Sequence, residues 1–284
     1  MSLTRRDFLV GSIALAASAS VPVPFLLPKY HVDRRPERSR VAILHAEQYS
    51  QKLDGILESG LRLFSIDVRG KQVVLKPNLV DYAPGAAINT HWLLVLAAAE
   101  SFRRMGAKSV VVAEGPGHQR DTQLVLSQGG HERALRDERI QFVDLNRDEL
   151  IRTPLRASYT GMKHLWLPRT VLGADFIVSM PKIKTHHWSG VTLSMKNMFG
   201  IVPGSKYGWP KNILHWTGIQ ESILDICATV PISFVIADGI VAMEGNGPLN
   251  GTPRNFGKIV LADDPVAADA TCVRLMGFDA RRIT

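Results

Sequence analysis

Short runs of consecutive apolar residues alternate with helical patterns along most of this chain. The runs that predict strands are 41–44, 73–75, 109–113, 141–143, 176–180, 233–237 and 259–262. Between them, 52–64, 90–105, 211–228 and 265–276 have the spacing or capping residues of helices. Strands that are apolar on both faces are typical of a parallel sheet covered by helices. We therefore expect an α/β fold with a mostly parallel sheet and helices on both faces.

The first 28 residues predict a targeting segment. Arg5 and Arg6 precede Phe8 and Leu9, and the run 8–27 carries no charge. A basic start, an apolar middle and a small-residue end such as Ala17-Ser18-Ala19 describe an export signal. The arginine pair resembles the twin-arginine signal, which implies a periplasmic or other extracytoplasmic protein and the twin-arginine translocation machinery as a partner.

A membrane anchor is the alternative interpretation of this segment, because about 20 apolar residues suffice to span a bilayer. Pro22, Pro24 and the serines weaken a permanent helix, so we favour cleavage near Ala19. An uncleaved signal would anchor the protein at the membrane. Residues 29–40 then form a basic linker, and 41–284 form a single α/β domain.

The composition excludes several classes of protein. Among 284 residues, Lys and Arg number 34 and Asp and Glu number 26, so the formal charge is +8. We expect no nucleic-acid partner, because aromatic residues do not alternate with the basic ones and no recognised module follows. Two cysteines cannot form an iron–sulfur cluster from this chain alone. Zincin, hydrolase-elbow and Walker motifs are absent from the sequence.

Charged residues follow several predicted strands on their C-terminal side. These positions are Lys76-Pro77-Asn78, Glu114-Gly115, Pro181-Lys182-Ile183-Lys184, Asp238-Gly239 and Asp263-Asp264. In an open parallel sheet these ends lie along one edge, where ligands bind. Strand ends are also charged simply because they emerge into water, but adjacent prolines and glycines stiffen the chain where the polar groups occur. We therefore expect one shared site.

This mixture of side chains predicts an anion site with a metal. The groups expected to bind the anionic substrate are Lys76, Asn78, Lys182, Lys184, Lys196 and Asn197, because lysines bind phosphate or carboxylate groups. Asp238, Glu244 and Asp264 are predicted ligands of Mg, Mn or Ca. Glu114, His91 and His186 are the candidate catalytic residues that move a proton. Lys184 and Lys196 could instead pair with carboxylates.

Several of these segments resemble the motifs of the family called domain of unknown function 362. They are Lys76-Pro77-Asn78, 181–186, 195–200, 238–240 with 244–248, and 264–270, in that order from Val41 to the end. The resemblance implies no general activity. Some members carry ferredoxin-like iron–sulfur segments, for which this chain lacks the cysteines. Members commonly continue beyond the helix of Asp269, which is consistent with a chain that lacks a C-terminal part.

Two functions follow as hypotheses. The first is an exported, metal-assisted enzyme that acts on a small phosphate- or carboxylate-bearing molecule, motivated by opposite charges at one edge. The second is a non-catalytic cofactor-binding or iron–sulfur and redox accessory protein with a redox partner, motivated by the export signal and by the family's iron–sulfur segments. Whether the chain is an enzyme stays open at this stage.

Overall fold

A computed structural model describes residues 38–117, 121–209 and 211–283. The predicted export signal and most of the basic linker lie outside the described residues. No helix within those three ranges is long and apolar enough to cross a membrane.

The central sheet has the strand order β1-β11-β10-β7-β2-β3-β4. The strands are β1 (Val41–His45), β2 (Gln72–Pro77), β3 (Ser109–Glu114), β4 (Gln141–Asp144), β7 (Phe176–Met180), β10 (Phe234–Glu244) and β11 (Thr252–Ala262). The neighbours from β10 through β7, β2 and β3 to β4 pair in parallel. The predicted α/β fold with a largely parallel sheet is therefore confirmed.

The reversed strand β11 makes this strand order mixed. β11 runs antiparallel to both β10 and β1, with Val235 and Val41 each opposite Ala262. The C-terminal end of β11 therefore lies at the edge opposite to that of the parallel strands. The apolar pattern could not reveal this reversal, because it reports burial and not strand direction.

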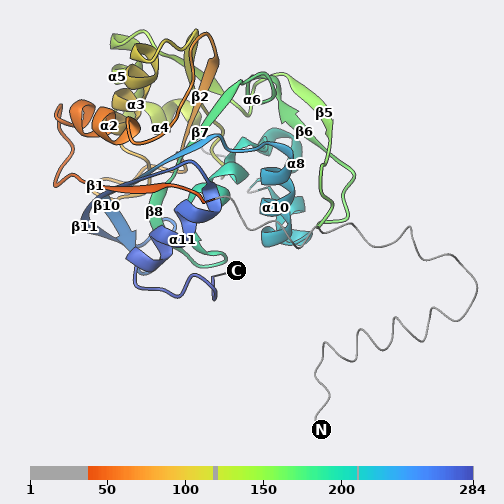
Figure 1. The fold of residues 1–284 in the computed structure, drawn as a ribbon. Helices are drawn as coiled ribbons and strands as arrows, with labels where there is room; N and C mark the ends of the chain where they lie inside the picture. Colours follow the sequence, from red (N-terminus) through yellow and green to blue (C-terminus); the bar gives the residue numbers. More distant parts are fainter. Residues whose placement is uncertain (1–37, 118–120, 210, 284) are drawn as a thin grey trace, which may run out of the picture. The chain divides into compact units, whose positions relative to one another are not determined.

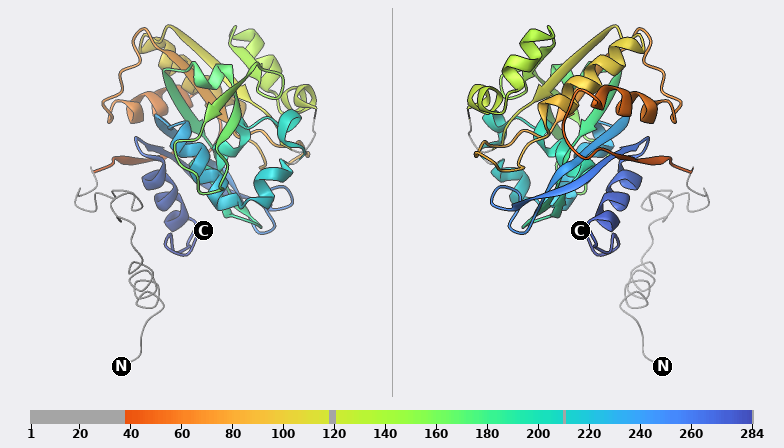
Figure 2. Two further views of the ribbon diagram at one scale, coloured as in Figure 1. Left: turned by 90° about the vertical axis from the view of Figure 1, so that its right-hand side faces the viewer. Right: turned by 90° about the vertical axis from the view of Figure 1, so that its left-hand side faces the viewer.

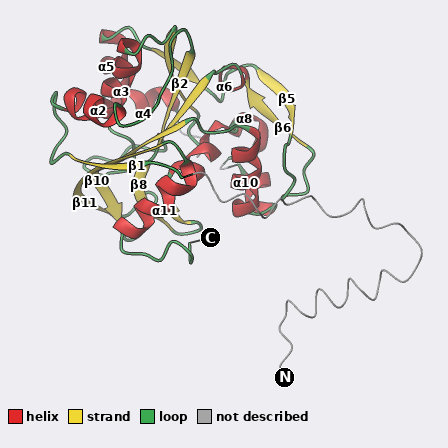
Figure 3. Cartoon of the chain, viewed as in Figure 1, coloured by secondary structure: helices red, strands yellow, loops and turns green. Residues whose placement is uncertain are grey.

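Helices cover both faces of the sheet. One apolar cluster packs α2 (Leu53–Leu61), α3 (Trp92–Arg104) and α5 (His131–Asp137) against residues such as Val73 and Leu75. The other packs α10 (Ile219–Thr229) and α11 (Pro265–Leu275) against the alternate residues of the same strands, including Val74. In both views of Figure 2, orange α2 and dark blue α11 lie on opposite sides of β1. Figure 3 shows the alternation of helices and strands.

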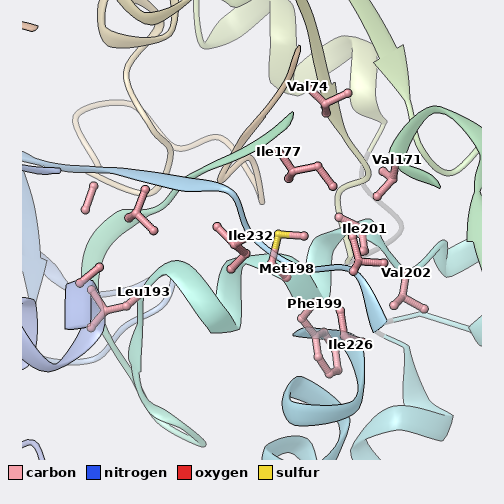
Figure 4. Packing of buried hydrophobic residues seen from close by; sticks show 14 of the residues in the cluster. Val74, Val171, Ile177, Leu193, Met198, Phe199, Ile201, Val202, Ile226 and Ile232 are labelled. Atoms are coloured by element: carbon pink, nitrogen blue, oxygen red, sulfur yellow. The ribbon is translucent and has the colours of Figure 1, made fainter. Parts of the chain in front are cut away.

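The edge where the parallel strands end is formed in part by elements that the apolar pattern did not predict. β8 (Lys182–His186) continues from β7, pairs with the extended β10 and forms a hairpin with β9 (Gly190–Thr192). A short helix, α7 (Ser194–Asn197), and the 3-10 helix Met198–Ile201 follow. Met198, Phe199 and Ile201 enter the second cluster beside Ile226 (Figure 4).

The remaining elements lie around this core (Figure 1). They are α4 (Thr122–Gln128), α6 (Arg169–Leu172), α8 (Gly204–Tyr207), α9 (Asn212–Trp216) and the separate hairpin of β5 (Leu150–Pro154) and β6 (His164–Pro168). The predicted helix 211–228 is two helices, because Gly218 at φ 103° breaks it between α9 and α10. A left-handed φ of this kind favours glycine.

Candidate functional site

A cavity of about 120 Å³ lies beyond the C-terminal ends of β2 and β3. We call it the lysine cavity. It is lined by Asn78, Leu79, Val80, Glu114, Gly115, Gly117, Lys184, His186, His187, Trp188, Thr192, Lys196, Asn197, Phe199, Gly200, Lys211, His215 and Pro248. Six of the predicted site residues are among them, namely Asn78, Glu114, Lys184, His186, Lys196 and Asn197.

A buried ion pair forms the base of this region. Lys76 at the end of β2 bonds Glu114 at the end of β3, and each side chain is 1% exposed. Glu114 also accepts hydrogen bonds from the backbone N–H of Leu79 (3.1 Å) and of Gly115 (2.8 Å). Burial lowers the pKa of Lys76, and Glu114 partly offsets that effect. With three donors around it, Glu114 acts as an acceptor that fixes the site's geometry.

Asn197 joins this pair to the neighbouring strands. Its Oδ1 accepts from Lys76 Nζ at 2.8 Å, and its Nδ2 donates to the carbonyl of Lys76 (2.9 Å) and to Ser179 Oγ (3.1 Å). The predicted substrate-binding Lys76 and Asn197 are thus bonded to protein groups. They hold β2, β3, β7 and α7 together at the cavity.

The start of α7 is held by a carboxylate from a distant helix. Asp269 of α11 accepts from the backbone N–H of Ser194 (2.7 Å) and of Met195 (3.0 Å), and from Ser194 Oγ (2.5 Å). A carboxylate at these first N–H groups satisfies donors that a helix start leaves free. Burial raises the pKa of Asp269 to about 6. Asp269 therefore positions the segment that carries Lys196.

Three other lysines reach the lysine cavity without a carboxylate partner among the described residues. Lys184 Nζ donates to the carbonyl of Ile88 at 2.7 Å, and Lys211 Nζ donates to that of Phe199 at 2.9 Å. Lys196 Nζ lies 4.5 Å from the centre of the Phe199 ring and has no hydrogen-bond acceptor within the described ranges. The alternative interpretation was that Lys184 and Lys196 pair with carboxylates. No such ion pair occurs among the described residues.

Burial and mutual repulsion lower the pKa values of these amines. Burial, offset in part by Glu114, lowers the pKa of Lys211 to about 7, and burial together with Lys76 lowers that of Lys196 to about 8. The pKa of Lys184 falls well below its usual value, through burial and then through Lys182, Lys196 and Lys76. Amines in this range accept and release protons near neutral pH.

Two buried oxygens in the lining have no hydrogen-bond partner among the described residues. They are Asn78 Oδ1 and Thr192 Oγ1. A buried polar atom without a partner is costly, and a ligand or ordered water commonly satisfies it. Both atoms therefore favour an occupant for the lysine cavity.

The imidazoles of the lining have assignable tautomers. His186 Nδ1 accepts from the backbone N–H of Trp188 (3.1 Å) and of Ser189 (3.3 Å), so its neutral ring carries the proton on Nε2. His187 Nδ1 and His215 Nδ1 each face a carbonyl at 3.1 Å, so they donate and leave Nε2 as an acceptor. Burial and Lys196 lower the pKa of His186 to about 3. His186 Nε2 is therefore a hydrogen-bond donor at neutral pH, whereas His215 Nε2 is a hydrogen-bond acceptor, and burial lowers the pKa of His215.

A separate cluster contains three other predicted site residues, namely Lys182, Asp238 and His91. Lys182 Nζ bonds Asp238 Oδ2 at 2.7 Å and Tyr49 Oη at 2.8 Å, and Tyr49 Oη donates to Asp238 Oδ1 at 2.7 Å. His91 stacks on Tyr49 with ring centres 3.8 Å apart, and its backbone N–H donates to Asp238 at 2.9 Å. Burial lowers the pKa of His91 to about 4. Its ring caps α3 by accepting from the backbone N–H of Leu93.

The structure does not bring the predicted metal ligands together. Asp238 is paired with Lys182, and Glu244, which β10 carries beyond the site, pairs with Arg254 on the surface. Asp264 follows the antiparallel β11 and caps α11 through the N–H of Ala267 at 2.7 Å. Within the described ranges, no group of three or more His, Cys, Asp or Glu is placed to hold a metal ion.

Several residues that line the cavity were not predicted from the sequence. Lys211 is the N-cap of α9 with φ 72°, and His215 lies one turn further on, both within the single helix predicted over 211–228. His187 lines the cavity beside the predicted His186, and their rings stack with centres 5.0 Å apart. Thr192 belongs to the unpredicted β9. Only the contacts of the folded chain identify these residues.

Comparisons with known proteins bear on this site. The family described as "Domain of unknown function (DUF362)" matches residues 73–274. A thylakoid-associated protein of Synechocystis sp. is 27% identical over 223 residues, which cover 75% of this chain and 65% of that protein. The chain thus spans about two thirds of that relative's length.

Solved structures with a similar chain path were also found. The lactate racemase apoprotein from Thermoanaerobacterium thermosaccharolyticum has a TM-score of 0.52 at 14% identity, covering 81% of this chain and 56% of that one. A protein from Thermotoga maritima has a TM-score of 0.44 at 14% identity, covering 83% and 61%. At this identity, the likeness to the racemase apoprotein shows a similar mixed α/β fold.

Proposed function

From the premise that this chain belongs to the DUF362 family, we propose that the lysine cavity binds a small molecule with phosphate or carboxylate groups, and that the protein is an enzyme acting on it. One observation carries the proposal. Lys184, Lys196 and Lys211 converge on a cavity whose one carboxylate among the described lining residues, Glu114, is already paired with Lys76.

An anion would relieve the electrostatic cost of this arrangement. Each buried amine is destabilised in its charged form by lost solvation and by its lysine neighbours. An oxyanion between Lys196 and Lys211 would favour the charged forms and raise both pKa values. Binding should therefore be accompanied by proton uptake near pH 8, where the unliganded amines are partly neutral.

The same groups can move a proton on a bound anion. Lys196 and Lys211 have pKa values of about 8 and 7, close to the pH at which a general acid or base works best. His215 Nε2 provides a neutral acceptor in the same lining. Asp238, Glu244 and Asp264 do not fit a shared metal ion, because each has another partner.

The test is calorimetric titration of the purified full chain with inorganic phosphate, pyrophosphate and malonate. We expect saturable binding of at least one anion, and heats that depend on the ionisation enthalpy of the buffer because protons are taken up. Lys196→Gln should weaken binding tenfold or more. The matched control is Lys108→Gln, which removes an exposed lysine far from the lining residues and should leave binding unchanged.

Two results would overturn parts of this proposal. If none of the three anions binds, or if Lys108→Gln weakens binding as much as Lys196→Gln, the cavity is not an anion site. If an anion binds but no proton exchange or turnover of its derivatives is found, the non-catalytic cofactor-binding alternative replaces the enzyme.

A further inference from the structure

Lys184 differs from the two ion-paired lysines of the site. Its side chain is fully buried on β8, and among the described residues its Nζ makes one hydrogen bond, to the carbonyl of Ile88 at 2.7 Å. Lys76 and Lys182, in contrast, each bond a carboxylate. A lysine in this setting donates one N–H to the carbonyl and keeps a nitrogen lone pair available, provided that the amine is neutral.

The surroundings of Lys184 favour that neutral amine. Burial is the largest cause, and the cations Lys182, Lys196 and Lys76 add to it, while Glu114 acts weakly in the opposite direction. A lysine made neutral by an apolar setting and by neighbouring cations is the usual form of an amine nucleophile in enzymes.

An unpartnered hydroxyl lies beside this amine. Lys184 and Thr192 are directly opposite each other in the antiparallel β8–β9 pair, so their side chains emerge on the same face about 5 Å apart at Cβ. Thr192 Oγ1 is buried without a hydrogen-bond partner among the described residues, and both residues line the lysine cavity. The hairpin therefore presents an amine and a hydroxyl to the same small space.

We propose that Lys184 is a nucleophile that forms an imine with a small aldehyde or ketone bearing a carboxylate or phosphate group. This inference rests on the proposed function, because Lys196 and Lys211 would hold the anionic group. It adds the reactive group of the ligand, a carbonyl, and the residue to which that group becomes attached.

The step balances without any redox partner. The Nζ lone pair forms a bond to the carbonyl carbon, and the electron pair of the C=O bond moves to its oxygen, which takes the proton released by the nitrogen. The resulting carbinolamine loses its hydroxyl group as water, with one proton supplied to the hydroxyl and one lost from the nitrogen, leaving the C=N bond of the imine. Thr192 Oγ1 can donate to the departing oxygen, and the imine can gain a proton from Lys196.

Reductive trapping tests the inference directly. The full chain is incubated at pH 7.5 with glyoxylate and cyanoborohydride, and the labelled lysines are identified by peptide mass spectrometry. We expect a single carboxymethyl group, located on Lys184 at glyoxylate concentrations that leave surface lysines such as Lys71 and Lys108 unmodified. Glycolaldehyde, which carries no charge, should label Lys184 at least tenfold more slowly.

Trapping and phosphate binding, measured side by side, separate this inference from anion binding itself. Lys184→Met keeps a buried unbranched side chain and should abolish trapping, whatever its effect on phosphate binding. Thr192→Val should slow trapping and leave the amine in place. If phosphate binds to the wild type but Lys184 is labelled no faster than Lys108, the nucleophile is overturned and the anion site stands. If phosphate and glyoxylate both fail to bind, the proposed function is overturned together with the nucleophile.

Discussion

Lys76 and Glu114 form an ion pair that is almost completely buried between the ends of two adjacent parallel strands. The lysines of the site are therefore of two kinds, those paired with a carboxylate and those without such a partner. Lys76 is neutralised within the protein, whereas Lys184, Lys196 and Lys211 have no carboxylate partner among the described residues. The pair therefore serves the architecture of the site, and we propose that the other three lysines bind a ligand.

Glu114→Gln tests the structural role of this pair. The substitution leaves Lys76 as an uncompensated buried cation, so we expect a loss of about 3–5 kcal/mol in the free energy of unfolding. Denaturant unfolding followed by circular dichroism measures it. The control is Glu244→Gln, which breaks an exposed pair with Arg254 and should change stability little. Equal effects of the two substitutions would contradict the account.

Gly200→Ala tests the close packing over the same pair. A Cβ at this position would lie 2.5 Å from Glu114 Oε1 and 2.5 Å from Lys76 Nζ. We expect a destabilisation of about 1–3 kcal/mol from overpacking, and weaker anion binding. Gly55→Ala is the matched control, because the new Cβ of this exposed residue in α2 meets nothing within 4 Å. It should raise stability by about 0.5–1 kcal/mol, since alanine favours a helix.

The lowered lysine pKa values predict an unusual pH dependence of stability. Lys211 and Lys196 have pKa values of about 7 and 8 in the folded protein and ordinary values near 10.5 when unfolded. Between these limits the unfolded chain binds more protons, so these two groups make stability rise with pH from about 7 to 10.5. Thermal melts at constant ionic strength measure the slope. Lys211→Met should reduce it, and an unchanged slope would contradict the shifted pKa.

Asp269→Asn tests the link between α11 and the cavity. The neutral amide cannot accept all three hydrogen bonds at the start of α7, so Lys196 loses its fixed position. We expect lower stability and at least a fivefold weaker affinity for the anion, measured by calorimetry. Because the pKa of Asp269 is raised to about 6, the folded chain binds the extra proton below that value. Its contribution to stability therefore falls as pH rises from about 4 to 6, and the variant should lack this slope.

Asp225→Asn is the matched control for that variant. Asp225 is also buried and accepts three hydrogen bonds, from the N–H groups of Tyr159 and Thr160 and from the Thr160 hydroxyl. It does not line the lysine cavity. Asp225→Asn should lower stability and leave anion affinity intact. A loss of affinity in both variants would show a general effect of destabilisation.

The pattern of strand ends predicted part of the site for a physical reason. β2 and β3 are parallel, so Lys76, Asn78 and Glu114 do emerge at one edge. Asp264 and Glu244 were also predicted for this site, but the structure does not place them there. β11, which precedes Asp264, runs in the opposite direction, and β10 carries Glu244 beyond the edge. Apolar runs report which residues are buried, but they carry no information on strand direction or on where a strand stops inside the fold.

The sequence also could not predict which groups each side chain contacts in the folded protein. Lys182 and Lys184 are lysines two positions apart on β8. Lys182 bonds Asp238 and Tyr49, whereas Lys184 bonds a single carbonyl oxygen among the described residues. Their different electrostatic roles depend on contacts with residues more than 50 positions away. Lys211 was missed for a similar reason, since its role depends on the left-handed turn that starts α9.

The most direct measurement is a crystal structure of the full chain soaked with selenate, an anion whose anomalous scattering locates it without ambiguity. The account predicts an anomalous peak in the lysine cavity, within hydrogen-bond distance of Lys196 Nζ and one further lysine, and its loss in Lys196→Gln. Selenate bound only at exposed arginines or lysines, with none in the cavity at saturating concentration, would contradict it.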